Sequence, residues 1–85
     1  MKARIIYMGK IGRRLEGPAI GKLLAKFLNN CRDDEIAAVI ECSEVDQISK
    51  TVIKTASKFI KNVPIFYVVN ANEEIKKSFS ELTSK

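Results

Sequence analysis

The sequence predicts a small α/β domain in which a mostly parallel three-stranded sheet carries flanking helices. Three apolar runs typical of strands alternate with three stretches of helical periodicity, in the order βαβαβα. Strands that alternate with helices usually lie parallel, because each helix returns the chain to the same end of the sheet. A chain of 85 residues supports one modest core, so we expect a single domain over residues 1–85.

A glycine- and arginine-rich loop separates the first strand from the first helix. Residues 3–8 are apolar with β-branched and aromatic members, which predicts a strand. We expect a loop over residues 9–17 and a helix from Pro18, because proline at the first helical position loses no needed N–H donor. Asn29 and Asn30 should end this helix. Its inward face is predicted from the helical spacing of Ile20, Leu23, Leu24, Phe27 and Leu28.

The second strand and helix follow an acidic turn at residues 33–35. Residues 36–42 are almost wholly apolar, which predicts a strand covered on both faces. Ser43 is expected to cap the next helix, with Asp46 three residues on in a variant of the capping box. Lys61 and Asn62 should end this helix. Its predicted buried stripe comprises Val45, Ile48, Val52, Ala56, Phe59 and Ile60.

Local signals define the last strand and helix. Residues 64–69 predict a strand whose proline is tolerated at its first position. Asn72 should cap a helix, and Glu73 and Glu74 suit its positive end. The side chains expected to point inward are Ile75, Phe79 and Leu82.

Charge is distributed in blocks of one sign. The formal net charge is +5, yet residues 1–32 carry +7, residues 33–46 carry −6 and residues 47–63 carry +4. Blocks of this kind indicate faces with different binding partners, although they also arise when opposite charges simply balance within the fold. Lys50, Lys54 and Lys58 lie at i, i+4 and i+8, in one row on the predicted second helix. A polyanion would relieve their mutual repulsion; a solvated helix face is the alternative.

The loop after the first strand is the candidate phosphate site. Gly9 and Gly12 flank Lys10, and glycines let backbone N–H groups approach phosphate oxygens. Residues 9–12 match the GxxG loop of KH domains, although that loop joins two helices and does not follow a strand. The alternative is a flexible surface loop without a binding role. Residues 17–23 are one residue short of a P-loop. The residues predicted to contact nucleic acid are Lys10, Arg13, Arg14, Lys22, Lys50, Lys54 and Lys58.

The composition argues against several kinds of site. The chain has no histidine and two cysteines, Cys31 and Cys42, whereas a zinc site needs about four such ligands. Without histidine the serines also lack their usual base. We therefore expect no metal, no cofactor and no enzymatic activity. We expect a cytoplasmic protein with two reduced thiols, Cys42 in the strand core and Cys31 in a loop. The longest apolar run, residues 65–69, is far too short to span a membrane.

The second half of the chain carries a family resemblance. Glu44-Val45-Asp46-Gln47-Ile48 is followed by Lys61-Asn62-Val63-Pro64, Tyr67-Val68 and Glu73-Glu74. With this spacing, residues 40–68 resemble the kink-turn RNA-binding ribosomal-protein family, which implies an α/β/α sandwich. That family's RNA-binding helix start reads Gly-x-Asn-Glu-x-x-Lys. Residues 17–22 lack the Asn-Glu pair, so no site residue is carried over. The strand–helix–strand half is also similar to the small regulatory subunit of rotary ATPases.

Two functions from different classes remain open. The basic first third, the glycine loop and the lysine row favour a non-catalytic module that binds nucleic acid, RNA rather than DNA, within a ribonucleoprotein such as the ribosome. Only Tyr7 and Tyr67 are placed to stack on bases, so backbone contacts should dominate. The charge blocks also suit a protein-interaction or regulatory subunit of a larger assembly.

Overall fold

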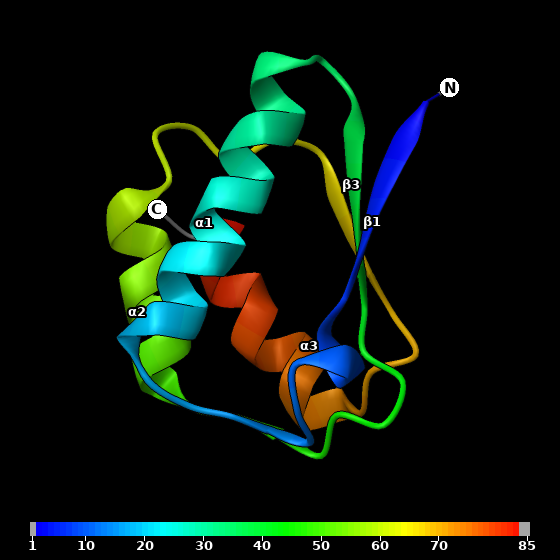
Figure 1. Cartoon of the computed structure of the whole chain (residues 1–85), viewed down its shortest axis with the longest axis vertical. Coiled ribbons are helices and arrows are strands. Elements are labelled where there is room, and N and C mark those ends of the chain that lie inside the picture. Colours follow the sequence, from blue (N-terminus) through cyan, green and yellow to red (C-terminus); the bar gives the residue numbers. More distant parts are fainter. Residues whose placement is uncertain (1, 84–85) are drawn as a thin grey trace.

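The computed structural model describes residues 2–83 and places a parallel sheet beside a layer of helices (Figure 1). The strands of the sheet, in the order β1-β3-β5, are β1 (Ala3–Tyr7), β3 (Ala37–Glu41) and β5 (Phe66–Val69). The helices are α1 (Pro18–Asp33), α2 (Lys50–Phe59) and α3 (Glu73–Ser80). The predicted α/β fold with a parallel three-stranded sheet is confirmed for the described residues.

Short elements occupy the connections that follow β1 and β3. The predicted loop contains a 3-10 turn, η1 (Met8–Lys10), and a two-residue strand, β2 (Arg14–Leu15). Strand β2 pairs in parallel with β4 (Gln47–Ile48) of the other connection. A second 3-10 turn, η2 (Glu81–Thr83), follows α3. The two connections therefore bind one another where the strands of the main sheet end.

Helix α1 begins as predicted and ends later than predicted. Gly17 precedes Pro18 with a φ of +93°, a conformation that favours glycine. The helix continues past Asn29 to Asp33, because inward-facing Cys31 extends the apolar stripe by another turn. The prediction that Cys31 lies in a loop is therefore wrong. Leu23 was also misplaced, since it is exposed on the outer face of the helix.

The N-cap of helix α2 lies six residues later in the chain than predicted. Ser49 is the N-cap and its side chain accepts the Val52 N–H at 3.4 Å. Ser43 instead bonds to a carboxylate of β3, and Asp46 is an exposed residue before β4, so both predicted capping roles are wrong. Phe59, expected in the buried stripe, is exposed, and Ile53 is buried in its place.

The last strand and helix match the predictions closely. Strand β5 starts at Phe66, two residues after the predicted start, and Pro64 lies before it. The Asn72 side chain accepts the Ile75 N–H at 2.9 Å and caps α3. The residues predicted to point inward are all buried: Ile75, Phe79 and Leu82.

Only one face of the sheet is covered by the described residues. Ala38, Ile40 and Val68 belong to or pack against the core that the helices complete. Side chains alternate along a strand, so Ile5, Val39 and Tyr67 lie on the other face. In Figure 1 the helices all lie on one side of the sheet. The predicted burial of residues 36–42 on both faces is therefore wrong, and the arrangement has two layers rather than those of an α/β/α sandwich. The cause is topological: strand order follows chain order, so successive crossovers of one hand place α1 and α2 on the same face.

Candidate nucleic-acid interface

An exposed aromatic ring between two lysines marks the outer surface of α1 and α2. Phe59, the last residue of α2, is 46% exposed. Lys22 Nζ of α1 lies 5.5 Å from the centroid of its ring, and Lys58 Nζ lies 5.8 Å from it. Both distances suit cation–π contacts. The structure thus brings two of the predicted lysines together around a phenylalanine that sequence reasoning had placed in the core.

The ring forms one wall of a shallow groove between the two helices. The groove has a volume of about 410 Å³ and is lined by Lys22, Ala25, Lys26, Asn29, Asn30 and Phe59. We call it the Phe59 groove. Lys26 lies one helical turn after Lys22 on α1 and adds a second lysine to the lining of the groove. Its contribution was missed, although Lys22 and Lys26 have the same i, i+4 spacing as the predicted lysine row.

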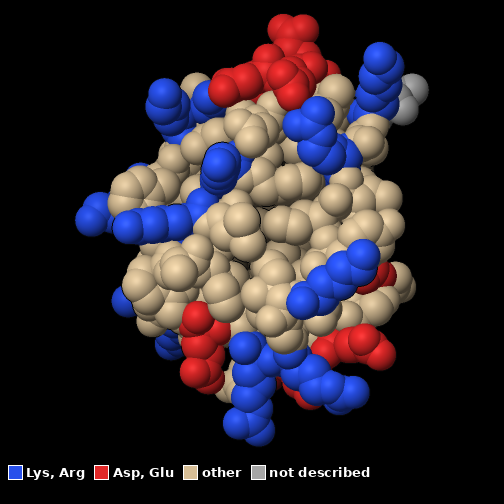
Figure 2. All heavy atoms as spheres, viewed as in Figure 1, with Lys and Arg blue, Asp and Glu red and all other residues tan. Residues whose placement is uncertain are grey.

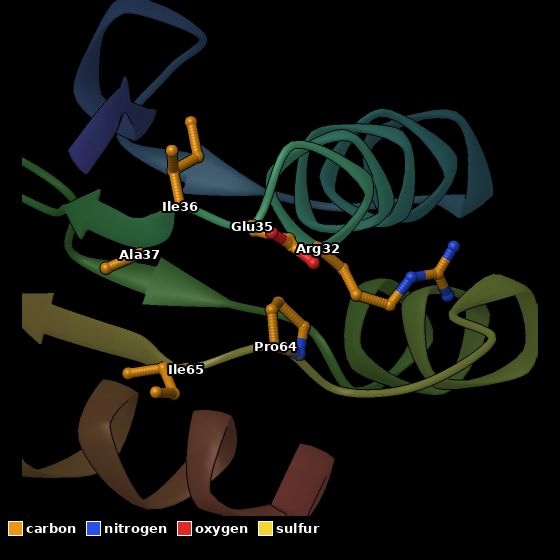
Figure 3. A pocket seen from close by; sticks show the side chains of 6 residues that line it. All are labelled: Arg32, Glu35, Ile36, Ala37, Pro64 and Ile65. Carbon is orange, nitrogen blue, oxygen red and sulfur yellow. The ribbon is translucent and has the colours of Figure 1, made fainter. Parts of the chain in front are cut away.

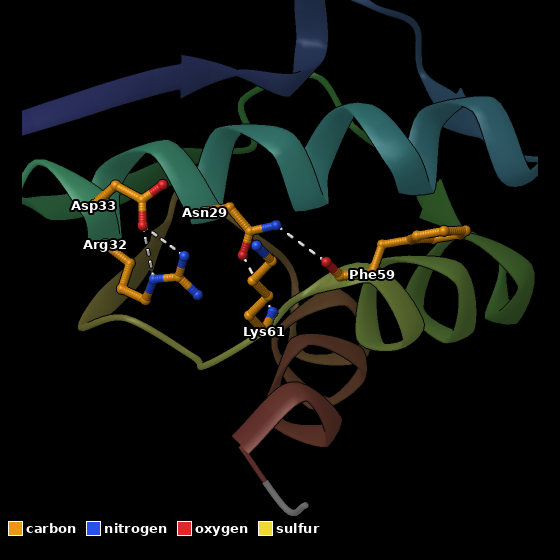
Figure 4. Close-up of polar contacts among 5 residues, drawn as sticks. All are labelled: Asn29, Arg32, Asp33, Phe59 and Lys61. Atoms are coloured by element: carbon orange, nitrogen blue, oxygen red, sulfur yellow. Dashed lines mark hydrogen bonds and ion pairs between the residues drawn. The ribbon is translucent and has the colours of Figure 1, made fainter.

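Asn29 fixes the end of α2 against α1 (Figure 4). Its Nδ2 donates to the Phe59 carbonyl at 3.0 Å, and its Oδ1 accepts the Lys61 N–H at 3.2 Å. The last carbonyls of a helix lack partners within the helix, so this amide satisfies a group that would otherwise need water. Asn29 therefore positions the backbone that carries the aromatic ring. Sequence reasoning assigned Asn29 to a helix stop and missed this role.

A glycine allows α1 and α2 to approach closely. A Cβ atom added at Gly21 would lie 2.6 Å from the Thr55 Cβ and 2.7 Å from the Val52 carbonyl oxygen. Only a residue without a side chain fits there. Because Lys22 follows directly, this close approach brings its ammonium group to the ring on α2.

Lys22 is the one predicted cation that lines the groove among the described residues, and Lys58 lies near it through its contact with the Phe59 ring. Lys10 Nζ lies 5.1 Å from the Tyr7 ring centroid and borders a different cavity at the end of the sheet. Arg13 lies 3.8 Å from Asp46, and both side chains are largely exposed, so the pair contributes little. Arg14 on β2, and Lys50 and Lys54 on α2, are exposed. Figure 2 shows basic side chains spread over the face in view, an acidic cluster at the end of the molecule where α1 finishes, and other acidic side chains toward the opposite end.

Two backbone N–H groups of the glycine loop already have hydrogen-bond partners within the protein. The Ile11 and Gly12 N–H groups both donate to the Met8 carbonyl, at 3.0 and 3.4 Å. Gly9 packs against the Ser43 carbonyl so closely that an added Cβ would collide with it. Packing therefore explains Gly9, and these two amides are already in use. The phosphate contacts predicted for this loop would have to come mainly from its side chains.

A carboxylate with several hydrogen-bond donors lies at the end of β3. Glu41 accepts bonds from the Asn70 side chain, the Ser43 hydroxyl and the Ser43 N–H. These bonds, that of Asn70 above all, hold the pKa of Glu41 below its usual value near 4.5. Asn70 has a φ of +57°, a conformation that asparagine tolerates better than most residues. Glu41 is therefore ionised at neutral pH on the uncovered face of the sheet.

We expect Asn70→Gly to raise the pKa of Glu41. Glycine keeps the positive φ and removes the largest hydrogen bond to the carboxylate. Because the folded-state pKa is depressed, the stability linked to Glu41 is present above pH 4.5 and is lost as pH falls through the folded-state pKa. NMR titration of the Glu41 side chain should show the change, and urea unfolding from pH 7 to pH 3 should show less acid sensitivity in the variant. An unchanged Glu41 titration would contradict the Asn70 contact.

Both thiols are buried, and the described acidic residues form no metal-binding cluster. Cys31 and Cys42 are free and buried, and burial raises the pKa of Cys42 to about 11. Burial also raises the pKa of Cys31. Both thiols are therefore protonated at neutral pH and are poor nucleophiles. Within residues 2–83, no three His, Cys, Asp or Glu side chains come together as a metal site would require, and no helix combines the length and apolar character needed to cross a membrane.

Comparison with protein-family models, curated proteins and solved structures finds no match for this chain.

Proposed function

We propose that the protein is a non-catalytic RNA-binding module, part of a ribonucleoprotein, that holds single-stranded RNA in the Phe59 groove. The observation that carries the proposal is the exposed Phe59 ring with Lys22 and Lys58 ammonium groups within 6 Å of its centroid. An aromatic platform beside positive charge is the usual arrangement for single-stranded nucleic acid, because a base stacks on the ring while cations hold the backbone.

Each side chain of the groove has a distinct part in this mechanism. An unpaired base stacks on Phe59, which favours single strands over a duplex whose bases are already stacked. Lys22 and Lys26 of the groove, with Lys58 beside the ring, neutralise phosphates on either side of that base. Asn29 keeps the ring in place through its bonds to α2 and contacts no base itself. Binding of this kind depends little on sequence, because every base has a face that can stack.

We expect Phe59→Ala to weaken binding of a labelled single-stranded oligouridine without changing its salt dependence. Loss of one stacked base costs about 1–3 kcal/mol, or roughly 5- to 150-fold in affinity. Three neutralised phosphates give a slope of log affinity against log salt of about −2, since each contributes about 0.7 on a single strand. Lys58→Gln should flatten that slope by about 0.7. Fluorescence anisotropy over a series of salt concentrations measures both quantities.

Tyr67→Ala is the matched control, because it removes an aromatic ring that is 51% exposed on the opposite side of the molecule. It should leave oligouridine affinity unchanged. Arg13→Ala with Arg14→Ala tests whether the predicted loop extends the interface, in which case the slope flattens by about one further unit. The proposal fails if the parent protein does not bind at ~50 mM salt, or if Phe59→Ala binds as tightly as the parent.

A further inference from the structure

The uncovered face of the sheet is a trough that runs along β3. Its floor is formed by the small side chains of Ala37 and Val39 on the central strand. On β1, Ile5 and Tyr7 rise beside it, and both are about half exposed. On the β5 side, Ile65 and Tyr67 form the other wall and are more exposed still. Strands of a parallel sheet are normally covered on both faces, so an apolar face of this kind indicates a missing layer.

The dimensions of the trough fit one helix better than a second copy of the chain. Two strand spacings make it about 10 Å wide, and five residues make it about 16 Å long. A helix is about 10–12 Å in diameter, and 16 Å corresponds to about eleven helical residues. A stable face-to-face dimer needs about 800 Å² from each partner, several times the area of this floor. An amphipathic helix that lays its apolar face in a groove is a recurring mode of peptide recognition.

Acidic groups stand at the end of the trough where the strands finish. A cavity of about 340 Å³ there is lined by Tyr7, Gly9, Lys10, Glu41, Ser43 and Glu44. The carboxylate of Glu41 is held by Ser43 and Asn70, and Glu44 is exposed. Two carboxylates and one lysine line this cavity, so this end carries a net negative charge. A basic side chain on the occupant would complement it.

The opposite end of the trough is mainly apolar and carries no net charge. Figure 3 shows a cavity between the turn before β3 and the segment before β5, with Ala37 and Ile65 shared with the trough. Ile36 and Pro64 complete its apolar lining, and Arg32 and Glu35 add one charge of each sign. Its volume is about 320 Å³. This space accepts a large apolar side chain. The two ends of the trough therefore differ in charge: the end where the strands begin is mainly apolar with no net charge, and the end where they finish is acidic.

We propose that the open sheet face docks an amphipathic helix of a partner protein, lying along β3, with a Lys or Arg at the acidic end and a large apolar residue at the other. The helix contributes an apolar stripe at i, i+3 or i+4, and i+7, which replaces the second helical layer of a three-layer α/β protein. This interface is separate from the Phe59 groove, on the other side of the sheet, so the two can be occupied together.

The test is a selection from a displayed library of 14-residue helical peptides, with the whole chain as bait. Recovered peptides should share the apolar stripe and a Lys or Arg one turn beyond it. The best of them, synthesised and labelled, should bind about 30-fold more weakly to Ile5→Gln and to Tyr67→Gln, as expected for central anchors. Leu23→Gln is the control, since Leu23 and Ile5 are each 46% exposed but lie on opposite layers. Glu41→Gln should weaken only peptides that carry the basic residue.

Four results would overturn the helix proposal. The first is that the parent chain enriches no peptides beyond those recovered by the Ile5→Gln/Tyr67→Gln double variant, used as a bait with the parent's melting temperature. The second is that the recovered peptides lack a helical apolar stripe. The third is a dimer in sedimentation equilibrium that Tyr67→Gln dissociates, which would assign the face to a second copy. The fourth is loss of oligouridine binding in Tyr67→Gln but not in Phe59→Ala, which would assign the face to nucleic acid and refute the Phe59 groove.

Discussion

Phe79→Ala is expected to lower the free energy of unfolding by about 3–5 kcal/mol. Phe79 lies on the inner side of α3, is 1% exposed and belongs to the single apolar cluster beneath the sheet. Truncation removes its transfer free energy and leaves a cavity that surrounding helices fill only partly. A domain of this size has about 5–15 kcal/mol in all. Urea unfolding followed by circular dichroism measures the loss.

Two other phenylalanines are internal controls for this substitution. Phe27 is partly buried and packs at the edge of the core, so Phe27→Ala should cost less than Phe79→Ala. Phe59 is about half exposed, so Phe59→Ala should cost the least. The chemical change is the same in all three variants, and only burial differs. If Phe79→Ala cost no more than Phe59→Ala, α3 would not pack as described.

Local sequence signals were sufficient to predict a helix start or an inward face that depends only on residues within the same short segment. Asn72 as N-cap, Glu73 and Glu74 in the first turn and the inward spacing of Ile75 and Phe79 all lie within one short segment. The same is true of Gly17 and Pro18 at the start of α1. Capping and helical periodicity act over a few residues, so the sequence alone could predict them.

Choices between equally apolar positions could not be predicted. In α2, Ile53 and Phe59 both fit a helical stripe that includes Val52 and Ala56, and packing against α1 decides between them. In β3 both alternating sets of side chains are apolar, so periodicity cannot reveal that Val39 faces outward. That outcome depends on strand order and on the side to which the crossovers turn.

The sequence predicted a set of charged residues for the candidate site, but not which of them lie close together in space. Lys22 and Lys58 were both assigned to helices, and both are exposed there. Their meeting at Phe59 depends on residues 36 positions apart lying side by side, which no local pattern encodes. A further signal was present but open to another interpretation, because a glycine such as Gly21 inside a helical pattern either weakens the helix or marks a close approach.

Gly21→Val is expected to lower the free energy of unfolding by about 3 kcal/mol, at the upper end for an overpacked site. Replacing a glycine inside a helix normally favours the helix, by a few tenths of a kcal/mol for valine and about 1 kcal/mol for alanine. Here steric overlap outweighs that gain, because an added Cβ lies 2.7 Å from the Val52 carbonyl oxygen, a backbone atom that cannot rotate away. Valine adds two further methyl groups to the same contact.

Gly21→Val is also expected to push α1 away from α2, and oligouridine binding provides a second measurement of this effect. Leu23→Val, on the exposed side of the same helix, controls for the helix propensity of valine and should cost only about 0.5 kcal/mol. Moving α1 outward carries Lys22 away from the Phe59 ring and strains the Asn29 bonds to α2. Oligouridine binding should therefore weaken in Gly21→Val at temperatures where the variant is still folded, while Leu23→Val binds as the parent does. A variant more stable than the parent would show that the two helices are not in contact at this glycine. A destabilised variant that binds oligouridine with full affinity would show that the Phe59 groove does not depend on the packing of α1 against α2.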